Sequence, residues 1–161
     1  MTLIHKQMDL FDAPKRSYIA HACNCVGVWG KGIAKSFKEK FPKSFQSYHD
    51  YVIGNHCLGT AFVCEMENNF YVVCLMSSVG YDSKVGDPKS IVSATTLALN
   101  DLLQQIPPNS IVYSNKFNSG LFNVPWEDTE KILLETLEKF PEITWIVCSN
   151  EVNKEGRKND T

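Results

Sequence analysis

The chain is poor in arginine, in net charge and in long apolar runs. Its 161 residues include only two arginines, Arg16 and Arg157, and its formal net charge is −2. An extended nucleic-acid interface needs a concentrated positive field, so no such surface is expected. Because no apolar run is long enough to cross a bilayer, we expect no membrane partner. Residues 1–20 lack the apolar core and cleavage site of a signal peptide.

Six cysteines raise the question of disulfides. Cys64, Cys74 and Cys148 lie inside apolar, strand-like runs, where free buried thiols are common. Disulfides are rare in reducing compartments. We therefore expect free thiols and a cytoplasmic or nuclear location.

Several catalytic motifs are also missing. The chain has no GxxxxGK[ST] phosphate loop, no Gly-x-Ser-x-Gly elbow and no arginine shortly after a cysteine. Asp9 and Asp12 lack the Asp-x-Asp spacing of aspartyl-phosphate phosphatases. His21, Cys23 and Cys25 could suggest a metal, but no second ligand pair has zinc-finger spacing. We expect no metal and no cofactor.

Apolar periodicity predicts an α/β fold. Strands are expected over residues 3–8, 18–22, 58–66, 70–76, 111–114 and 143–148, and helices over 31–41, 43–53, 88–105 and 125–140. This alternation predicts a three-layer α/β/α sandwich with a mixed, largely parallel sheet of about six strands. Residues 1–150 are expected to form a single domain, and 151–161 a polar, disordered tail.

Two glycine-containing loops carry the strongest indication of function. His21–Ala34 runs from a strand through glycines into a helix, and Asn118–Asn123 follows a later strand. Ligands of α/β folds bind beyond the carboxyl ends of the strands, so both loops are expected at one cleft. Bare amides at a helix N-terminus and close backbone approach at glycines suit a diphosphate that carries sugars at both ends. Asp9, directly after the first strand, is acceptor-only and suits an exocyclic amine such as that of adenine.

These motifs resemble those of the macrodomain family, whose members bind ADP-ribose. Met8-Asp9-Leu10-Phe11 is similar to the family's Gly-Asp-hydrophobic motif, and His21-Ala22-Cys23-Asn24 falls where many members have Asn-Ala-Ala-Asn. Trp29–Ala34 falls on the glycine-rich loop around the distal ribose, and Asn118–Asn123 with Pro125 resembles the second loop. The resemblance implies a macrodomain-like fold over nearly the whole of residues 1–150.

The strings around His21–Ala34 and Asn118–Trp126 are most similar to the fungal ADP-ribose 1″-phosphate phosphatase branch. That likeness implies a metal-independent enzyme that removes the terminal phosphate of a small-molecule substrate, and we expect it to be a monomer. The expected ligand-binding residues are Asp9, Leu10, Cys23, Asn24, Cys25, Trp29, Gly30, Lys31, Gly32, Ile33, Asn118, Ser119, Gly120, Leu121, Phe122 and Asn123.

The expected catalytic residues are His21, Asn24 and Lys31. A histidine titrates near neutral pH and suits a general acid or base, Asn24 would orient the distal ribose or a water, and Lys31 would neutralise the extra phosphate. Alternatively His21 only bonds the backbone, Cys23 and Cys25 only pack, and Trp29 packs beside the loop. Asp9 could also simply cap a turn.

Two other functions stay open. The chain could be a non-catalytic ADP-ribose reader, or a hydrolase that removes ADP-ribose from macromolecules. The glutamate-directed deglycosylase branch uses a lysine and an aspartate where this chain has Ser77 or Ser78 and Phe122, so a lysine adduct would require Lys84. Asp82, Lys84 and Asp87 form either an ordinary exposed loop or a lid over the distal ribose.

Overall fold

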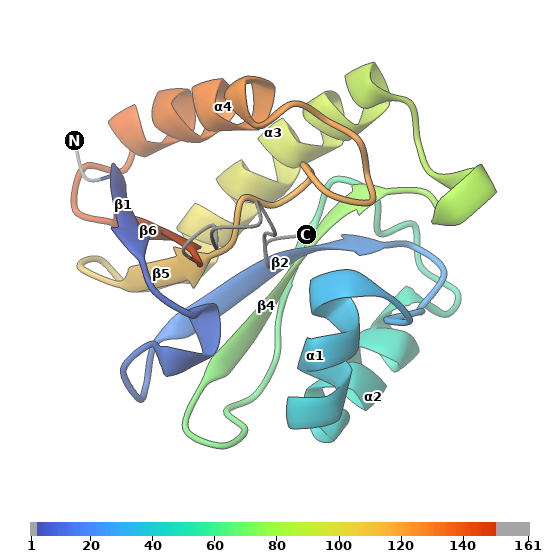
Figure 1. The fold of residues 1–161 in the computed structure, drawn as a ribbon, viewed down its shortest axis with the longest axis horizontal. Coiled ribbons are helices and arrows are strands. Elements are labelled where there is room, and N and C mark those ends of the chain that lie inside the picture. The colour runs from blue at the N-terminus through green and yellow to red at the C-terminus, as the bar shows by residue number, and fades with distance from the viewer. Residues whose placement is uncertain (1–2, 151–161) are drawn as a thin grey trace.

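Strands and helices alternate along residues 3–150, the part of the chain that this computed structural model describes (Figure 1). The strands are β1 (Leu3–Gln7), β2 (Tyr18–Asn24), β3 (Ala61–Val63), β4 (Tyr71–Ser78), β5 (Ile111–Ser114) and β6 (Thr144–Ser149). The helices are α1 (Gly32–Lys40), α2 (Pro42–Val52), α3 (Pro88–Gln105) and α4 (Trp126–Glu138), with short 3₁₀ turns η1 (Leu10–Asp12) and η2 (Asp82–Lys84). The expected tail, 151–161, lies outside the described residues.

The sheet has the order β1-β6-β5-β2-β4-β3. All neighbouring strands pair in parallel except β3, which runs antiparallel to β4. The predicted mixed, largely parallel sheet of six strands is therefore confirmed.

The hairpin before β4 is shorter than predicted, since β3 covers only Ala61–Val63. The Glu67 carboxylate accepts hydrogen bonds from the amides of Lys43 and Ser44 at the start of α2. These bonds hold the end of the hairpin against α2, while the Cys64 amide still donates to the Val72 carbonyl beyond β3.

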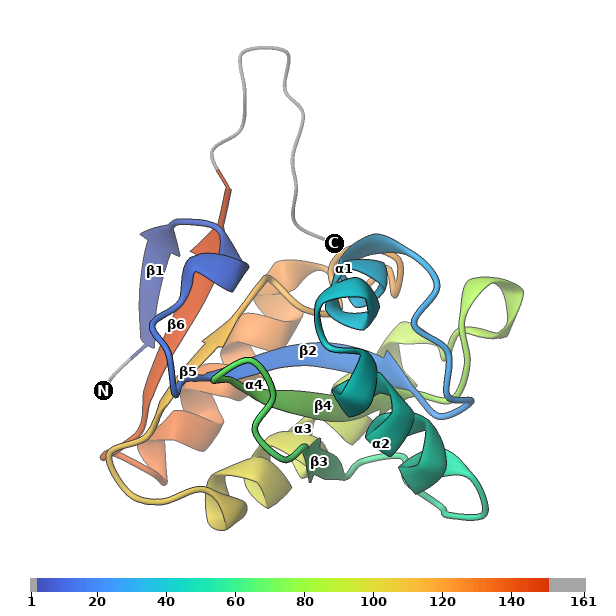
Figure 2. The ribbon, with the colours of Figure 1, turned by 90° about the horizontal axis from the view of Figure 1, so that it is seen from below.

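Period-two alternation in β2 separates two apolar layers. Ile19 and Cys23 pack with residues of α1 and α2, whereas Ala20 and Ala22 pack with residues of α3 and α4. Figures 1 and 2 show the resulting three layers, with α1 and α2 over one face of the sheet and α3 and α4 over the other. Within residues 3–150 no helix combines the length and apolar character needed to cross a membrane.

Candidate functional site

A cavity of about 270 Å³ opens where three adjacent parallel strands, β5, β2 and β4, end. Its walls come from the segments that follow these strands, as expected for ligand sites in such sheets. The structure brings together these predicted ligand residues at the cavity: Cys23, Asn24, Trp29, Gly30, Lys31, Ile33, Asn118, Gly120, Leu121 and Phe122. The two glycine loops thus meet at one site, although they are far apart in the sequence.

Other predicted residues do not line this cavity. They are Asp9, Leu10, His21, Cys25, Gly32, Ser119 and Asn123. Conversely, sequence reasoning missed Ala22, Val28, Ala34, Tyr81, Asn115 and Phe117, which do line it, and named Asp82, which also lines it, only as an alternative lid residue. Three of the missed residues follow β4 or β5, so the carboxyl-end rule would have found them had the neighbours of β2 been known.

Asn24 shapes the first loop with its side chain. Its Oδ1 accepts hydrogen bonds from the amides of Val26 (3.1 Å) and Val28 (3.3 Å) and from the Tyr48 hydroxyl (2.9 Å). Its Nδ2 donates to the Val28 carbonyl at 2.7 Å. These bonds occupy its oxygen and one amide hydrogen, so Asn24 holds the loop in shape, and its expected role in orienting the distal ribose or a water stays a prediction.

Trp29 both packs and lines the cavity. It is 1% exposed and stacks on Tyr48, with ring centroids 4.8 Å apart. The next residues lead into α1, whose N-cap is Lys31 and whose first residue, Gly32, has a φ of +59°. Lys31, Ile33 and Ala34 line the cavity, so the N-terminus of α1 lies in its wall, where the positive end of the helix dipole favours an anion.

The second loop is held by a buried amide. Asn118 accepts a hydrogen bond from the Ser77 hydroxyl and donates to Thr95 Oγ1, both at 2.9 Å. It therefore joins the loop to β4 and α3, and its side chain is used structurally. Asn118 and Asn123 both have positive φ, +68° and +60°, which asparagine tolerates well.

His21 is completely buried and its side chain lies outside the cavity lining. Its ring stacks on Phe37 with centroids 3.9 Å apart and meets the Trp29 ring edge-on. Burial lowers the pKa of His21 to about 3, so the imidazole is neutral at neutral pH. The geometry therefore does not support the expected general acid or base role, and it also differs from the alternative of a bond to the backbone.

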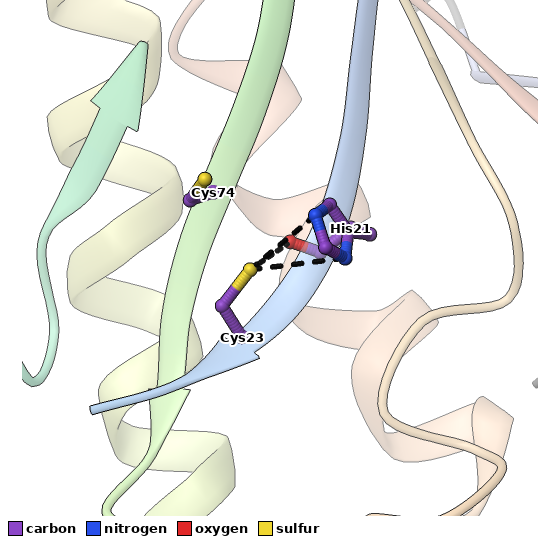
Figure 3. A group of neighbouring side chains, drawn as sticks. All are labelled: His21, Cys23 and Cys74. Carbon is purple, nitrogen blue, oxygen red and sulfur yellow. Dashed lines mark hydrogen bonds between the residues drawn. The ribbon is translucent and has the colours of Figure 1, made fainter. Parts of the chain in front are cut away.

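His21, Cys23 and Cys74 form a buried group whose possible ligand atoms lie within 4.8 Å of one another (Figure 3). His21 and Cys23 are two residues apart on β2 and so share a face. Cys23 Sγ lies 3.5 Å from His21 Nε2 and 3.7 Å from Nδ1. Being almost equidistant from both nitrogens, the sulfur faces the ring and not the lone pair of either one, so this arrangement does not aim the imidazole at a shared metal.

The cysteine thiols are free and mostly buried. Burial and the neighbouring Cys57 raise the pKa of Cys25, and burial raises the pKa of Cys74. Neither thiol is therefore activated as a nucleophile. This agrees with the packing alternative for Cys25, and Cys23 combines packing with a place in the cavity wall.

Asp9 caps the turn that follows β1. Its Oδ1 accepts a 2.9 Å hydrogen bond from the amide of Phe11, at the start of η1. Asp9 is exposed, Leu10 is buried beneath it, and β1 is the edge strand, separated from β2 by β6 and β5. The structure thus realises the turn-capping alternative.

The segment after β4 reaches over the cavity. Tyr81 and Asp82 line it, and Asp82 forms a 3.2 Å ion pair with Lys31 across the opening. Lys84 is exposed and outside the cavity lining, so it does not supply a lysine for an adduct. Asp87 accepts from the Ser90 amide and caps α3. Of the three residues of the predicted lid, Asp82 lines the cavity and Lys84 and Asp87 do not, and a lid over the distal ribose stays a prediction.

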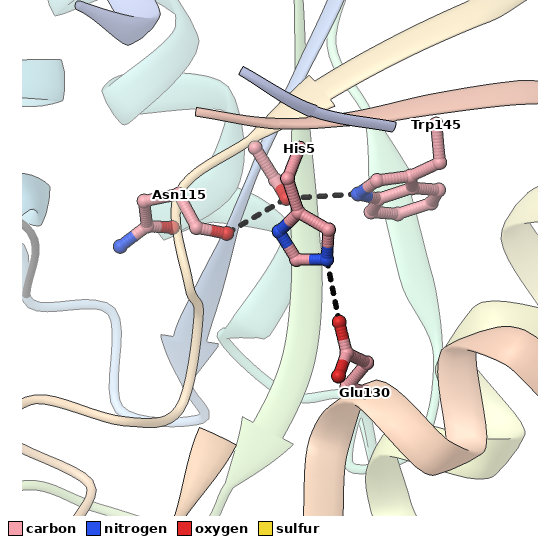
Figure 4. Close-up of polar contacts among 5 residues, drawn as sticks. His5, Asn115, Glu130 and Trp145 are labelled. Atoms are coloured by element: carbon pink, nitrogen blue, oxygen red, sulfur yellow. Dashed lines mark hydrogen bonds and ion pairs between the residues drawn. The ribbon is translucent and has the colours of Figure 1, made fainter. Parts of the chain in front are cut away.

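The opposite wall begins at the end of β5. Trp145 Nε1 donates to the Ser114 hydroxyl at 2.8 Å, and Ser114 donates to the Asn115 carbonyl at 2.8 Å (Figure 4). The nearby contact of His5 with Glu130, at 2.6 Å, ties β1 to α4. These bonds fix the strand end from which Asn115 and Phe117 enter the cavity wall.

The model of the family described as "Macro domain" matches residues 20–133. The chain belongs to the macrodomain family. This macrodomain is 38% identical to the ADP-ribose 1″-phosphate phosphatase of Candida albicans over 79% of its own length and 88% of that protein. It is 37% identical to the protein of that name from Lodderomyces elongisporus, over 83% and 91% of the two chains.

Solved structures agree with the fold. The macrodomain of Mycobacterium tuberculosis DarG superposes with a TM-score of 0.77 at 22% identity, covering 91% of this chain and 97% of that one. The structure of Thermosipho africanus DarTG in complex with ADP-ribose superposes with a TM-score of 0.74 at 16% identity, covering 97% of this macrodomain and 43% of that chain. At these identities the comparison concerns the fold alone.

Proposed function

We propose that this macrodomain binds ADP-ribose 1″-phosphate and removes its terminal phosphate. The observation that carries the proposal is Lys31, a cation at the mouth of the two-loop cavity. The 31–38% identity to proteins named ADP-ribose 1″-phosphate phosphatases supports the same substrate. Unmodified ADP-ribose has no terminal phosphate at this end, so a simple ADP-ribose reader would not need the lysine.

The chemistry follows from the placement of charge. Hydrolysis breaks the bond between phosphorus and the 1″-oxygen; water supplies the new oxygen of inorganic phosphate, and the 1″-oxygen leaves with a proton. Lys31 and the positive end of the α1 dipole offset the negative charge that the transferring phosphoryl group carries. Such preorganised donors contribute several kcal/mol to transition-state stabilisation.

The adenine end is proposed to lie at Asp9. Asp9 uses Oδ1 for the turn, and its Oδ2 has no hydrogen bond within residues 3–150, so that oxygen suits the exocyclic amine. An inosine analogue, which has a carbonyl in place of this amine, is expected to bind about tenfold more weakly than the adenine ligand. Asp9→Ala should largely remove this difference.

The function is tested by incubating the protein with ADP-ribose 1″-phosphate and following inorganic phosphate and ADP-ribose. We expect the wild type to release phosphate with and without a chelator, and Lys31→Met to lose most of this activity. Lys139→Met, which removes an exposed lysine just after α4, is the matched control and should keep full activity. Binding of ADP-ribose without phosphate release would identify a reader, and release of ADP-ribose from a modified protein would identify a deglycosylase.

A further inference from the structure

Lys31 and Asp82 face each other across the opening of the cavity. Among the cavity-lining residues, all within 3–150, Lys31 is the one cation and Asp82 the one carboxylate. Lys31 Nζ lies 3.2 and 3.3 Å from the two Asp82 oxygens. The single positive charge expected to meet a terminal phosphate is thus already paired within the protein.

The two partners come from different elements. Lys31 is the N-cap of α1, and Asp82 begins η2 in the loop after β4. Buried Ser78 holds both ends of this loop, because its hydroxyl donates to the Gly80 carbonyl (2.7 Å) and accepts from the Gly86 amide (3.0 Å). The carboxylate is therefore presented to Lys31 by a loop with a fixed base.

The ion pair is exposed enough for a ligand to replace Asp82 as the partner of Lys31. The Lys31 side chain is 64% exposed and that of Asp82 48% exposed. Ion pairs of this kind contribute little to stability because water and salt screen them. A ligand phosphate, with two charges and three acceptor oxygens, can replace one carboxylate on the ammonium group at low cost.

We propose that Asp82 is a specificity-determining residue, the internal counter-ion that competes with the terminal phosphate for Lys31. The inference rests on the proposed function, because it takes the phosphorylated end of the ligand to lie at the cavity mouth. The carboxylate neutralises Lys31 when the phosphate is absent and opposes the phosphate when it is present. It therefore lowers the preference for the phosphorylated ligand over ADP-ribose and favours release of the phosphate product.

The test compares two ligands in a double-mutant cycle. Calorimetry measures binding of ADP-ribose and of its non-hydrolysable 1″-phosphonate analogue to the wild type, Asp82→Asn, Lys31→Met and the double variant. Asp82→Asn should bind the phosphonate about fivefold more tightly while its affinity for ADP-ribose changes less than about twofold. Lys31→Met should weaken binding of the phosphonate selectively. In this background Asp82→Asn should bring a smaller gain, because it relieves only the direct repulsion between the carboxylate and the phosphonate.

Glu142→Gln, an exposed carboxylate-to-amide change just before β6 at the other end of the strands, is the control for net charge and should leave both affinities unchanged. Unchanged phosphonate affinity in Asp82→Asn, or an equal gain with Lys31 removed, would overturn the counter-ion role while leaving the proposed function intact. A wild type that binds neither ligand would overturn the proposed function, and the inference with it.

Discussion

His21 lies inside an aromatic layer with Phe37 and Trp29, and this burial gives the protein a pH-dependent stability. The pKa of His21 is about 3 in the folded protein, below the value near 6.5 expected when the chain is unfolded. Between these values the unfolded state binds more protons, so the contribution is fully present above pH 6.5 and is lost as the pH falls towards 3. From pH 7 to pH 5 the loss should be about 2 kcal/mol.

Denaturant unfolding at both pH values, on the wild type and on His21→Phe, measures this effect. Phenylalanine keeps a flat ring against Phe37 and cannot titrate, so the variant should lose about 2 kcal/mol less on acidification. Equal pH dependence in the two proteins would contradict the pKa shift. Phosphate release by His21→Phe distinguishes a packing role of His21 from a catalytic one. If His21 only packs, turnover should stay near that of the wild type, and if it acts as a general acid or base, turnover should be lost.

At the scale of the element, the first loop depends on one glycine. Gly27 has a φ of +82°, and a Cβ there would lie 2.7 Å from His49 Nδ1. The same His49 nitrogen contacts the Gly27 carbonyl at 3.1 Å, which ties the loop to α2. Gly27→Ala should therefore cost about 2–4 kcal/mol in the free energy of unfolding, because the backbone strain at positive φ and the close contact of the new Cβ with His49 both destabilise the loop. The same change should weaken ADP-ribose binding.

Gly54 provides the matched control. Its φ is +76°, but a Cβ there has nothing within 4 Å. Gly54→Ala should cost about 1 kcal/mol, from backbone strain alone, and leave ligand affinity unchanged. Equal effects of the two substitutions, in unfolding and in calorimetry, would show that the His49 contact does not shape the loop.

For the whole molecule, saturation with ADP-ribose should raise the melting temperature. A ligand that binds only the folded state at about 100 times its Kd adds about 2.7 kcal/mol, or about 5–10 °C for a chain of this size. Differential scanning fluorimetry with ADP-ribose, and with inosine diphosphate ribose as the matched ligand, measures the shift. No shift at millimolar ADP-ribose would contradict binding in the cavity.

At the scale of the whole molecule, part of the fold could be predicted from the sequence. Helix 88–105 and strand 111–114 have the predicted bounds, because a proline or a polar turn marks their ends. The two loops meet as expected since parallel strands end at one edge. Tyr81 was missed, and Asp82 was named only as an alternative lid residue, because their place depends on β4 lying beside β2. Strand order is not encoded in local periodicity.

The side-chain roles were harder to predict than the loops. His21 and Asn24 stand in a loop motif that suggests chemistry, yet one is covered by aromatic rings and the other is used by backbone amides. Both outcomes depend on residues of α1 and α2, Phe37 and Tyr48, whose approach to β2 is a tertiary contact. Sequence spacing gives no measure of that contact.

The bonds of Ser78 have a mechanical consequence for the loop that carries Asp82. One buried hydroxyl joins Gly80 to Gly86, so the segment between them is closed at its neck like a ring. The conformational entropy of ordering those residues is then lost during folding, so binding a ligand does not have to order the loop.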